Sequence, residues 1–206
     1  MIDRTLLHYD QEAENISSRY ENADMSWLYE IITRTFPAES RLLELGCGSG
    51  RDAGILLRSG LDIIATDGSP AMLEQAAALH PELKDRLLQY ELPGQSDFDA
   101  CSFDGILAIA VLMHLKLGGI KDTLKEVFRL LKPGGRFFFS VPDKRPDIDE
   151  CSFDTIGRRF SMLSSEEWEE LCCAAGLVKL YAVRNDDSLG REQVAWLSFL
   201  FKKPEE

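Results

Sequence analysis

Residues 41–67 read RLLELGCGSGRDAGILLRSGLDIIATD, and this stretch decides the fold class. RLLEL and DIIATD are apolar runs of strand length, and RDAGILLRS between them has apolar residues at helical spacing. The loop GCGSG joins the first strand to the helix, and Gly60 ends the helix. A strand, a helix and a second strand in this order form a βαβ unit with parallel strands. The stretch therefore predicts an α/β fold built on a parallel sheet.

The same alternation continues along the chain and predicts seven strands. The further strands are expected at 86–92, 103–110, 136–141, 177–183 and 194–201. The further helices are expected at 70–80, 120–131 and 164–176. Ser69 before Pro70, and Ser164 with Glu167, are typical of helix starts. No helix separates the last two strands, so we expect one of them to be antiparallel.

The whole chain, residues 1–206, is expected to form one domain in three parts. These are an N-terminal helical cap at 1–40, a cofactor-binding core at 41–142 and a substrate-side part at 143–206. In the cap, 5–23 is expected to be one helix, and Asp24 to start a second helix that Pro37 ends. The stretch 143–159 is longer than an ordinary connection, which predicts either a lid or a mobile segment.

The glycine loop predicts a ligand site. Glycine has no Cβ, so such a loop lets a ligand approach the backbone and exposes N–H groups to it. The dinucleotide fingerprint G-x-G-x-x-G needs a third glycine at position 51, where this sequence has Arg51. The glycines instead follow G-x-G-x-G at Gly46, Gly48 and Gly50.

ELGCGSGRDA resembles the first motif of class I S-adenosylmethionine-dependent methyltransferases. The resemblance extends in order through IIATDGSPAML, FDGILAIAVLMHL and LKEVFRLLKPGGRFFFSVP, and so covers 41–142. It implies that Glu44 is the acidic residue at the end of the first strand and that the Asp67 carboxylate binds both ribose hydroxyls. An ionised carboxylate can accept two hydrogen bonds from a diol. The alternative for Asp67 is a helix cap, a task that Ser69 already suits.

The resemblance also implies a Rossmann-like three-layer sandwich with strand order 3214576 and strand 7 antiparallel. HYDQEAENISSRY near the start and SLGREQVAWLSFLFKK near the end are similar to a group of small bacterial methyltransferases, most of unassigned substrate. This second similarity informs the fold more than the reaction.

Further cofactor contacts follow from the resemblance. Gly68 and Met72 are expected against the adenine, although Met72 is equally plausible as a core residue of its helix. Cys47 lies within the glycine loop. The remaining expected contacts are Glu91 and Leu92 at the adenine, with Asp97 as the alternative acid, and Ala108 and Ile109 at the methionine moiety.

Four side chains have two readings each. His114 could act as a general base, but a lone histidine is more often a packed residue at a helix start. Tyr9 and Tyr20 could cover the cofactor or be ordinary amphipathic contacts. Arg51 could neutralise the cofactor carboxylate or face solvent.

The net charge and the composition limit the classes of partner that we expect the protein to bind. The formal net charge is -12, which disfavours a nucleic acid, although Arg145, Arg158 and Arg159 could form a local basic patch. We expect no metal site, disulfide, signal peptide or membrane span. The protein is expected to be cytoplasmic and to be a monomer or a homodimer.

The expected activity is methyl transfer to a small molecule by direct in-line displacement. DNA bases are not expected as acceptors, because the segment AIAV stands where DNA base methyltransferases carry their Pro-Pro-Tyr motif. The N-terminal helices, 143–160 and 184–193 are expected to form the walls of the acceptor site. Alternatives are a protein or RNA methyltransferase, a non-enzymatic cofactor-binding module and a nicotinamide-dependent oxidoreductase.

Overall fold

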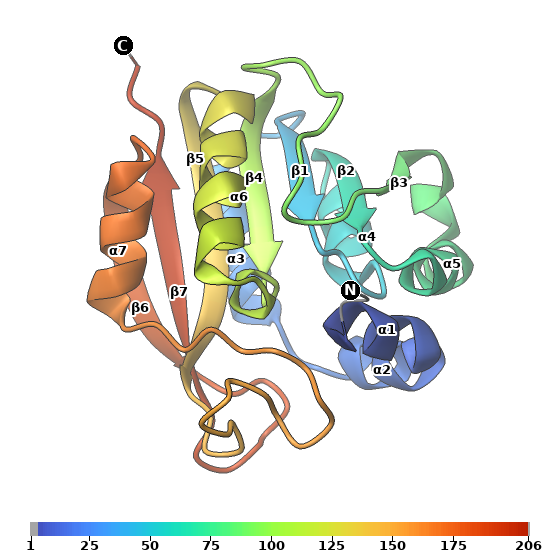
Figure 1. The fold of residues 1–206 in the computed structure, drawn as a ribbon. Helices are drawn as coiled ribbons and strands as arrows, with labels where there is room; N and C mark the ends of the chain where they lie inside the picture. The colour runs from blue at the N-terminus through green and yellow to red at the C-terminus, as the bar shows by residue number, and fades with distance from the viewer. Residues whose placement is uncertain (1–3, 206) are drawn as a thin grey trace.

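The computed structural model describes residues 4–205 and shows a seven-stranded sheet with helices on both faces (Figure 1). The strand order is β3-β2-β1-β4-β5-β7-β6, and β7 is antiparallel to both of its neighbours. The strands are β1 (Arg41–Leu45), β2 (Asp62–Asp67), β3 (Leu87–Gln89), β4 (Phe103–Ile109), β5 (Leu131–Lys144), β6 (Val178–Asp186) and β7 (Ala195–Lys202). The predicted order 3214576 and the antiparallel strand 7 are therefore confirmed.

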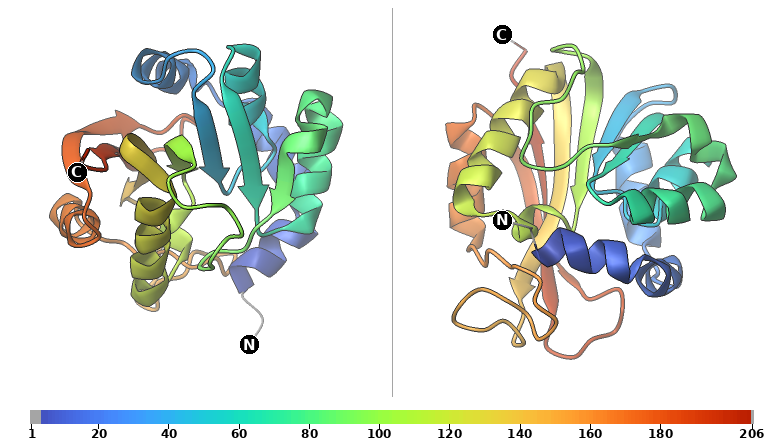
Figure 2. Two further views of the ribbon diagram at one scale, coloured as in Figure 1. Left: turned by 90° about the horizontal axis from the view of Figure 1, so that it is seen from above. Right: turned by 45° about the vertical axis from the view of Figure 1, so that its right-hand side comes forward.

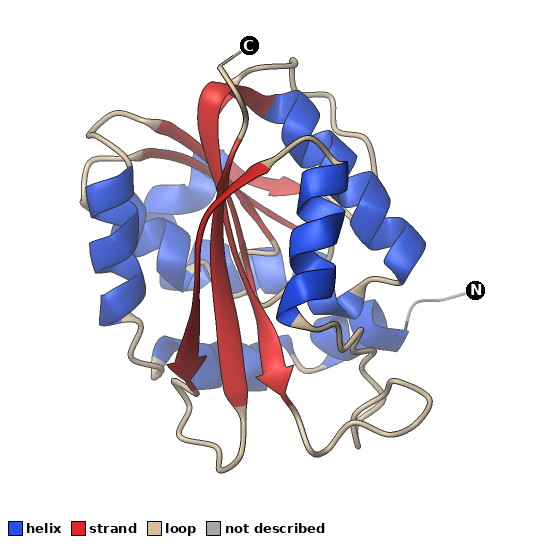
Figure 3. Ribbon diagram, turned by 90° about the vertical axis from the view of Figure 1, so that its left-hand side faces the viewer, coloured by secondary structure: helices blue, strands red, loops and turns tan. Residues whose placement is uncertain are grey.

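Two layers of helices enclose the sheet (Figure 3). The helices are α1 (Arg4–Gln11), α2 (Ala13–Glu21), α3 (Ser26–Thr35), α4 (Arg51–Arg58), α5 (Pro70–Leu79), α6 (Leu117–Leu130) and α7 (Ser165–Ala174), with short 3-10 turns η1 (Pro81–Arg86) and η2 (Leu112–His114). Apolar residues of α3 and α4 pack on one face of the sheet, and those of α6 and α7 pack on the other. No helix within residues 4–205 is long and apolar enough to cross a membrane.

The phenylalanines of β5 show why both faces must be covered. Successive side chains of a strand point to opposite faces, so Phe137 and Phe139 join the core under α6 and α7 while Phe138 joins the core under α3 and α4. Phe139 stacks on Phe199 of β7 with ring centroids 4.8 Å apart. A strand that is apolar on both sides is stable only between two layers of helices.

Several helix starts and ends agree with the sequence. Ser69 caps α5 by accepting a hydrogen bond from the Met72 N–H, and the capping box of Ser164 with Glu167 begins α7. The extended backbone of Phe36 ends α3 just before Pro37.

Other boundaries differ. The predicted single helix at 5–23 is two helices, α1 and α2, which are separated at Glu12. Asp24 is not the N-cap of α3; that position is Met25, although Asp24 Oδ1 accepts a hydrogen bond from the Ser26 N–H at 3.0 Å. β3 is shorter than predicted, because it is an edge strand whose Leu88 and Gln89 are exposed and gain little from pairing.

The carboxyl ends of β1, β2, β4 and β5 meet at one edge of the sheet, and α1 and α2 lie across that edge near β1 and β2 (Figures 1 and 2). Polar contacts hold them there. The Ser69 hydroxyl donates to Asp10 of α1 at 2.5 Å, and the Ser49 hydroxyl donates to Glu21 of α2 at 2.6 Å. The N-terminal helices thus form a cover over the loops that follow β1 and β2.

The glycine loop supplies a stability prediction. Gly46 and Gly60 both have positive φ, at 72° and 90°, but a Cβ on Gly46 would lie 2.6 Å from Val111 Cγ2 whereas a Cβ on Gly60 would meet nothing within 4 Å. Gly60→Ala should cost about 1 to 2 kcal/mol of unfolding free energy through backbone strain alone. Gly46→Ala should cost about 1 to 3 kcal/mol more through overlap with Val111. Urea denaturation of both variants measures this difference, and equal losses would contradict it.

Candidate functional site

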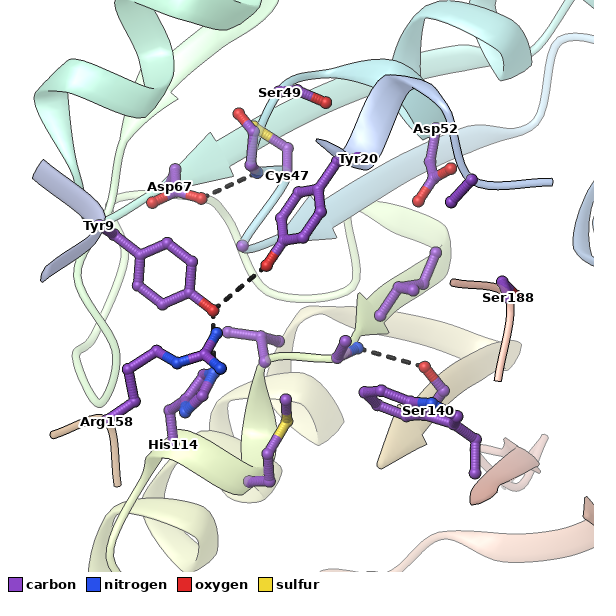
Figure 4. Close-up of a pocket in the computed structure, with 18 of the residues that line it drawn as sticks. Tyr9, Tyr20, Cys47, Ser49, Asp52, Asp67, His114, Ser140, Arg158 and Ser188 are labelled. Carbon is purple, nitrogen blue, oxygen red and sulfur yellow. Dashed lines mark hydrogen bonds between the residues drawn. The ribbon is translucent and has the colours of Figure 1, made fainter. Parts of the chain in front are cut away.

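One deep pocket opens at the carboxyl edge of the sheet, under α1 and α2 (Figure 4). Its walls come from the loops after β1, β2, β4 and β5, from the β6–β7 turn and from the N-terminal helices. The residues singled out from the sequence that line it are Tyr9, Tyr20, Gly46, Cys47, Gly48, Arg51, Asp67, Gly68, Glu91, Leu92, Ile109 and His114. Residues far apart in the sequence therefore meet at this one edge.

The glycine loop forms the floor of the pocket. Gly46, Gly48 and Gly50 have φ values of 72°, 57° and 81°, a region that favours glycine. A Cβ on Gly48 would lie 3.5 Å from the ring of Tyr20, so the space above the loop is bounded by that ring. The glycine loop thus forms a concave backbone surface, the glycine cradle, and side chains at the glycine positions would fill the space above it.

Asp67 stands beside this cradle at the end of β2. Its Oδ2 accepts a hydrogen bond from the Gly48 N–H at 2.9 Å, and its Oδ1 accepts one from the Ser69 N–H at 2.9 Å. No cation pairs with this carboxylate within residues 4–205. Burial raises the pKa of Asp67 above its usual value. Each oxygen can still accept a further hydrogen bond, as a vicinal diol requires.

Four other singled-out residues do not reach the pocket surface. Met72 and Ala108 are fully buried and Glu44 is 1% exposed, so all three lie behind the wall. Met72 packs against Ala13 and Ile16, which favours its role as a core residue of α5 over a contact with the adenine. Asp97 also lies outside the lining. The structure therefore does not bring these four residues to the space where a ligand would bind.

Glu44 is nevertheless unusual. No group within residues 4–205 forms a hydrogen bond with its Oε2, and burial together with the nearby Asp52 raises its pKa well above the ordinary value. A protonated carboxyl group is the form that such a setting favours.

Arg51 is held by the protein itself. Its Nε donates to Asp52 Oδ1 at 2.8 Å, its Nη2 donates to Asp52 Oδ2 at 3.1 Å, and its Nη1 donates to the Tyr20 carbonyl at 2.5 Å. The expected pairing with a cofactor carboxylate would compete with these bonds. Here Arg51 joins the glycine loop to α2.

His114 lies in a chain of hydrogen bonds that begins on the N-terminal helices (Figure 4). Its Nδ1 is 2.6 Å from the Arg159 carbonyl, which can only accept, so Nδ1 carries the proton. Its Nε2 accepts from the Tyr9 hydroxyl at 3.0 Å, and that hydroxyl is 3.4 Å from the Tyr20 hydroxyl. Burial lowers the pKa of His114 to about 4, so the ring is neutral.

The basic residues suggested as a surface patch are arranged differently. Arg145 and Arg158 are 8% and 7% exposed and line the pocket. Both lie over the ring of Phe160, at 4.4 Å and 5.4 Å from its centroid. These two arginines therefore offer no exposed surface to a nucleic acid.

The sequence analysis did not assign these arginines, or Trp27 and Trp196, to the site. The one signal was the length of 143–159, which predicted a functional segment without showing which side chains turn inward. The β6–β7 turn also lines the pocket as expected, and Asp187 there accepts hydrogen bonds from Arg191 Nη2 and Trp196 Nε1 at 2.6 Å and 2.8 Å.

Residues 4–205 contain no group of three or more His, Cys, Asp or Glu side chains arranged to hold a metal ion.

Comparison with known proteins agrees with this geometry. Residues 43–137 match a family described as a methyltransferase domain. An S-adenosyl-L-methionine-dependent Diels-Alderase of Talaromyces variabilis is 32% identical over 136 residues, covering 64% of this chain and 44% of that protein. A ubiquinone biosynthesis O-methyltransferase of Xanthomonas axonopodis pv. citri is 29% identical over 119 residues, covering 56% of this chain and 48% of that protein. The chain thus spans about half the length of these curated relatives.

A solved structure shares nearly the whole fold. The 1,6-didemethyltoxoflavin-N1-methyltransferase of Burkholderia thailandensis, solved with 1,6-didemethyltoxoflavin and S-adenosylhomocysteine, superposes with a TM-score of 0.77 at 20% identity, covering 98% of this chain and 88% of that one. Residues 43–137, which contain the glycine loop and Asp67, thus match the methyltransferase domain family, and the chain shares the fold of this solved methyltransferase.

Proposed function

We propose that this protein binds S-adenosylmethionine and transfers its methyl group to a small-molecule acceptor. The observation that carries the proposal is the Asp67 carboxylate, which is half-buried beside the glycine cradle, has no cation partner within residues 4–205 and keeps an accepting position on each oxygen. A ribose diol would supply the two donors that this carboxylate lacks.

The fold indicates which residues would hold each part of the cofactor. Asp67 would bind the ribose, and Gly68, Glu91 and Leu92, which lie beyond β2 and β3, would contact the adenine. Gly46, Cys47 and Gly48 would border the methionine moiety together with Ile109 at the end of β4. Tyr20 would cover it from α2, because its ring already bounds the space above Gly48.

The protein's task is then positioning. When bound, S-adenosylmethionine supplies a methyl group already activated by a positively charged sulfur. The side chains of the pocket must align an acceptor with that group and exclude water, which can lower the barrier by about 7 to 11 kcal/mol. The predicted catalytic role of His114 stays a prediction; in this arrangement both of its ring nitrogens are engaged.

Enclosure favours a small acceptor over a macromolecule. α1 crosses the edge of the sheet, where Tyr9 contacts His114 and the Arg159 N–H donates to the Thr5 hydroxyl at 2.9 Å. A protein or RNA substrate would have to displace these contacts. The sequence has Arg51 where the dinucleotide fingerprint needs its third glycine, which counts against the nicotinamide-dependent oxidoreductase.

Replacement of Asp67 tests the cofactor site. Asp67→Ala should weaken binding of S-adenosylhomocysteine by a few kcal/mol, because it removes charge-assisted hydrogen bonds to the ribose. Isothermal titration calorimetry measures the change. Asp62→Ala, at the opposite end of β2, is the matched control and should bind normally. Unchanged affinity of Asp67→Ala would remove this residue from the site.

The same carboxylate predicts a pH dependence. Burial raises the pKa of Asp67, and only its ionised form can accept both ribose hydrogen bonds. Affinity for S-adenosylhomocysteine should therefore fall as the pH is lowered through that pKa, by up to about tenfold per unit below it. Burial lowers the pKa of His114 to about 4, and Asp67→Asn separates any contribution of this ring from that of Asp67. Calorimetry across this pH range should show the fall in the unsubstituted protein and a flat profile in Asp67→Asn.

Transfer from labelled S-adenosylmethionine into a cell extract tests the class of acceptor. After incubation, the extract is divided by size into small molecules and macromolecules. Label should enter the small-molecule fraction, and boiled enzyme is the control. Label confined to protein or RNA would support the macromolecular alternative. Cofactor binding without transfer to either fraction would support a non-enzymatic module.

A further inference from the structure

The far end of the pocket, beyond β4 and β5, is built differently from the end near Asp67. We call it the acceptor end and define it by Tyr9, His114, Arg145, Arg158 and Phe160, all of which line the pocket. In the sheet order, β1 and β4 separate the ends of β2 and β3 from those of β5 and β7. A cofactor bound at Asp67 and the glycine loop would leave the acceptor end for the second substrate, so the inference below rests on the proposed function.

Two arginines are fixed at this end by carboxylates behind them. Arg158 Nε donates to Oδ2 of Asp154 at 2.8 Å, and its Nη2 forms an ion pair with the same oxygen at 2.7 Å. Arg145 pairs with Asp147 through Nε and Nη2 at 2.7 Å and 2.6 Å, and its Nη2 is also 3.9 Å from Asp154 Oδ2. The two guanidinium groups therefore share one buried carboxylate and one aromatic ring.

Both arginines keep donors on the pocket side. Within residues 4–205, no hydrogen bond engages Nη1 of Arg145. The Arg158 side chain hydrogen-bonds the Tyr9 hydroxyl, a contact that an oxyanion in the pocket would replace. Figure 4 shows the Arg158 guanidinium beside the Tyr9 hydroxyl and the ring of His114. Charge-assisted donors that a rigid network holds in place are a common means of binding carboxylate and other oxyanions.

The charge of the protein makes this end distinctive. The chain has 35 acidic and 23 basic residues, so its surface as a whole repels anions. Of the carboxylates that neutralise the arginine pair, Asp154 is buried and Asp147 is part exposed, and neither lines the pocket. The acceptor end therefore presents the two guanidinium groups to a ligand, while Asp187 in the neighbouring turn is paired with Arg191.

The acceptor end also has no side chain ready to remove a proton. His114 Nδ1 donates to the Arg159 carbonyl, and Nε2 accepts from Tyr9. The Tyr9 oxygen can accept a hydrogen bond, but its own proton is already directed at His114. An acceptor that arrives without its proton needs no base.

We propose that the methyl acceptor is a small organic acid that binds and reacts as its anion, with its oxyanion held by the guanidinium groups of Arg145 and Arg158. An oxygen lone pair of the anion forms the bond to the methyl carbon while the S–CH₃ bond breaks and its electron pair stays on sulfur. The negative charge on oxygen and the positive charge on sulfur disappear together. No proton is transferred.

The charge of the acceptor can be tested without knowing its identity. The small-molecule fraction of the extract is passed over an anion-exchange resin, and the flow-through and the eluted anions are each supplied with labelled S-adenosylmethionine and enzyme. Label should enter the eluted anions, and the labelled product should carry one negative charge fewer than its substrate, so that the product of a monoanion no longer binds the resin. Label entering only the flow-through would overturn the assignment of an anionic acceptor. A product that keeps the full charge would overturn the assignment of the reacting oxygen.

Two variants test the arginines with the eluted anions as substrate. Arg145→Gln leaves only the part-exposed Asp147 unpaired, and should raise KM for the acceptor by about tenfold while affinity for S-adenosylhomocysteine is unchanged. Arg158→Gln combined with Asp154→Asn avoids leaving a buried carboxylate alone, and should act in the same direction. Arg184→Gln is the control, because Arg184 pairs with Asp143 outside the pocket lining.

The possible failures can be told apart. No label in any small molecule would count against the proposed function itself. Label in the anions with an unchanged KM in both arginine variants would overturn the arginine site alone. A variant that loses S-adenosylhomocysteine binding and melts early has not folded, and in that case the resin experiment on the unsubstituted protein decides.

Discussion

The hydrogen bond from the Gly48 N–H to the Asp67 carboxylate is the contact on which the site depends. It joins the loop after β1 to the end of β2, which are adjacent parallel strands. The loop can bend toward Asp67 because its glycines adopt positive φ, and the bend would be blocked at Gly46 by a Cβ against Val111. The sheet thereby brings the glycine cradle and a half-buried acceptor of hydrogen bonds into one place.

The cover over this place is held by polar contacts to several parts of the core. Asp10 binds Ser69 after β2, Glu21 binds Ser49 in the glycine loop, and Tyr9 binds His114 after β4. Ala13 and Ile16 of α2 also pack against Met72 of α5. Polar and apolar contacts together hold the N-terminal helices over the loops that follow β1 and β2.

The two ends of the pocket differ in charge for a physical reason. Near the glycine loop, Asp67 is an acceptor without a cation, which suits hydroxyl groups. At the acceptor end, Arg145 and Arg158 are donors whose counter-ions stand behind them, which suits an oxyanion. The same cations, together with burial, hold the pKa of His114 low, since a second positive charge there would be repelled.

The sequence by itself determined the alternation of strands and helices, the glycine loop and the helix starts at Ser69 and Ser164. These features depend on local patterns, because apolar periodicity, glycine spacing and capping residues act within a few positions of the chain. The resemblance in four ordered blocks implied the strand order, the antiparallel β7 and the role of Asp67.

Only the tertiary structure decided which side chains face the pocket. Met72 has the spacing of both a core residue and a ligand contact, and packing of α2 on α5 placed it in the core. Arg145 and Arg158 have the composition of a surface patch, yet an irregular segment turns them inward onto Asp154 and Phe160. Local periodicity carries no information about such a segment, because its direction is set by contacts with residues distant in the sequence.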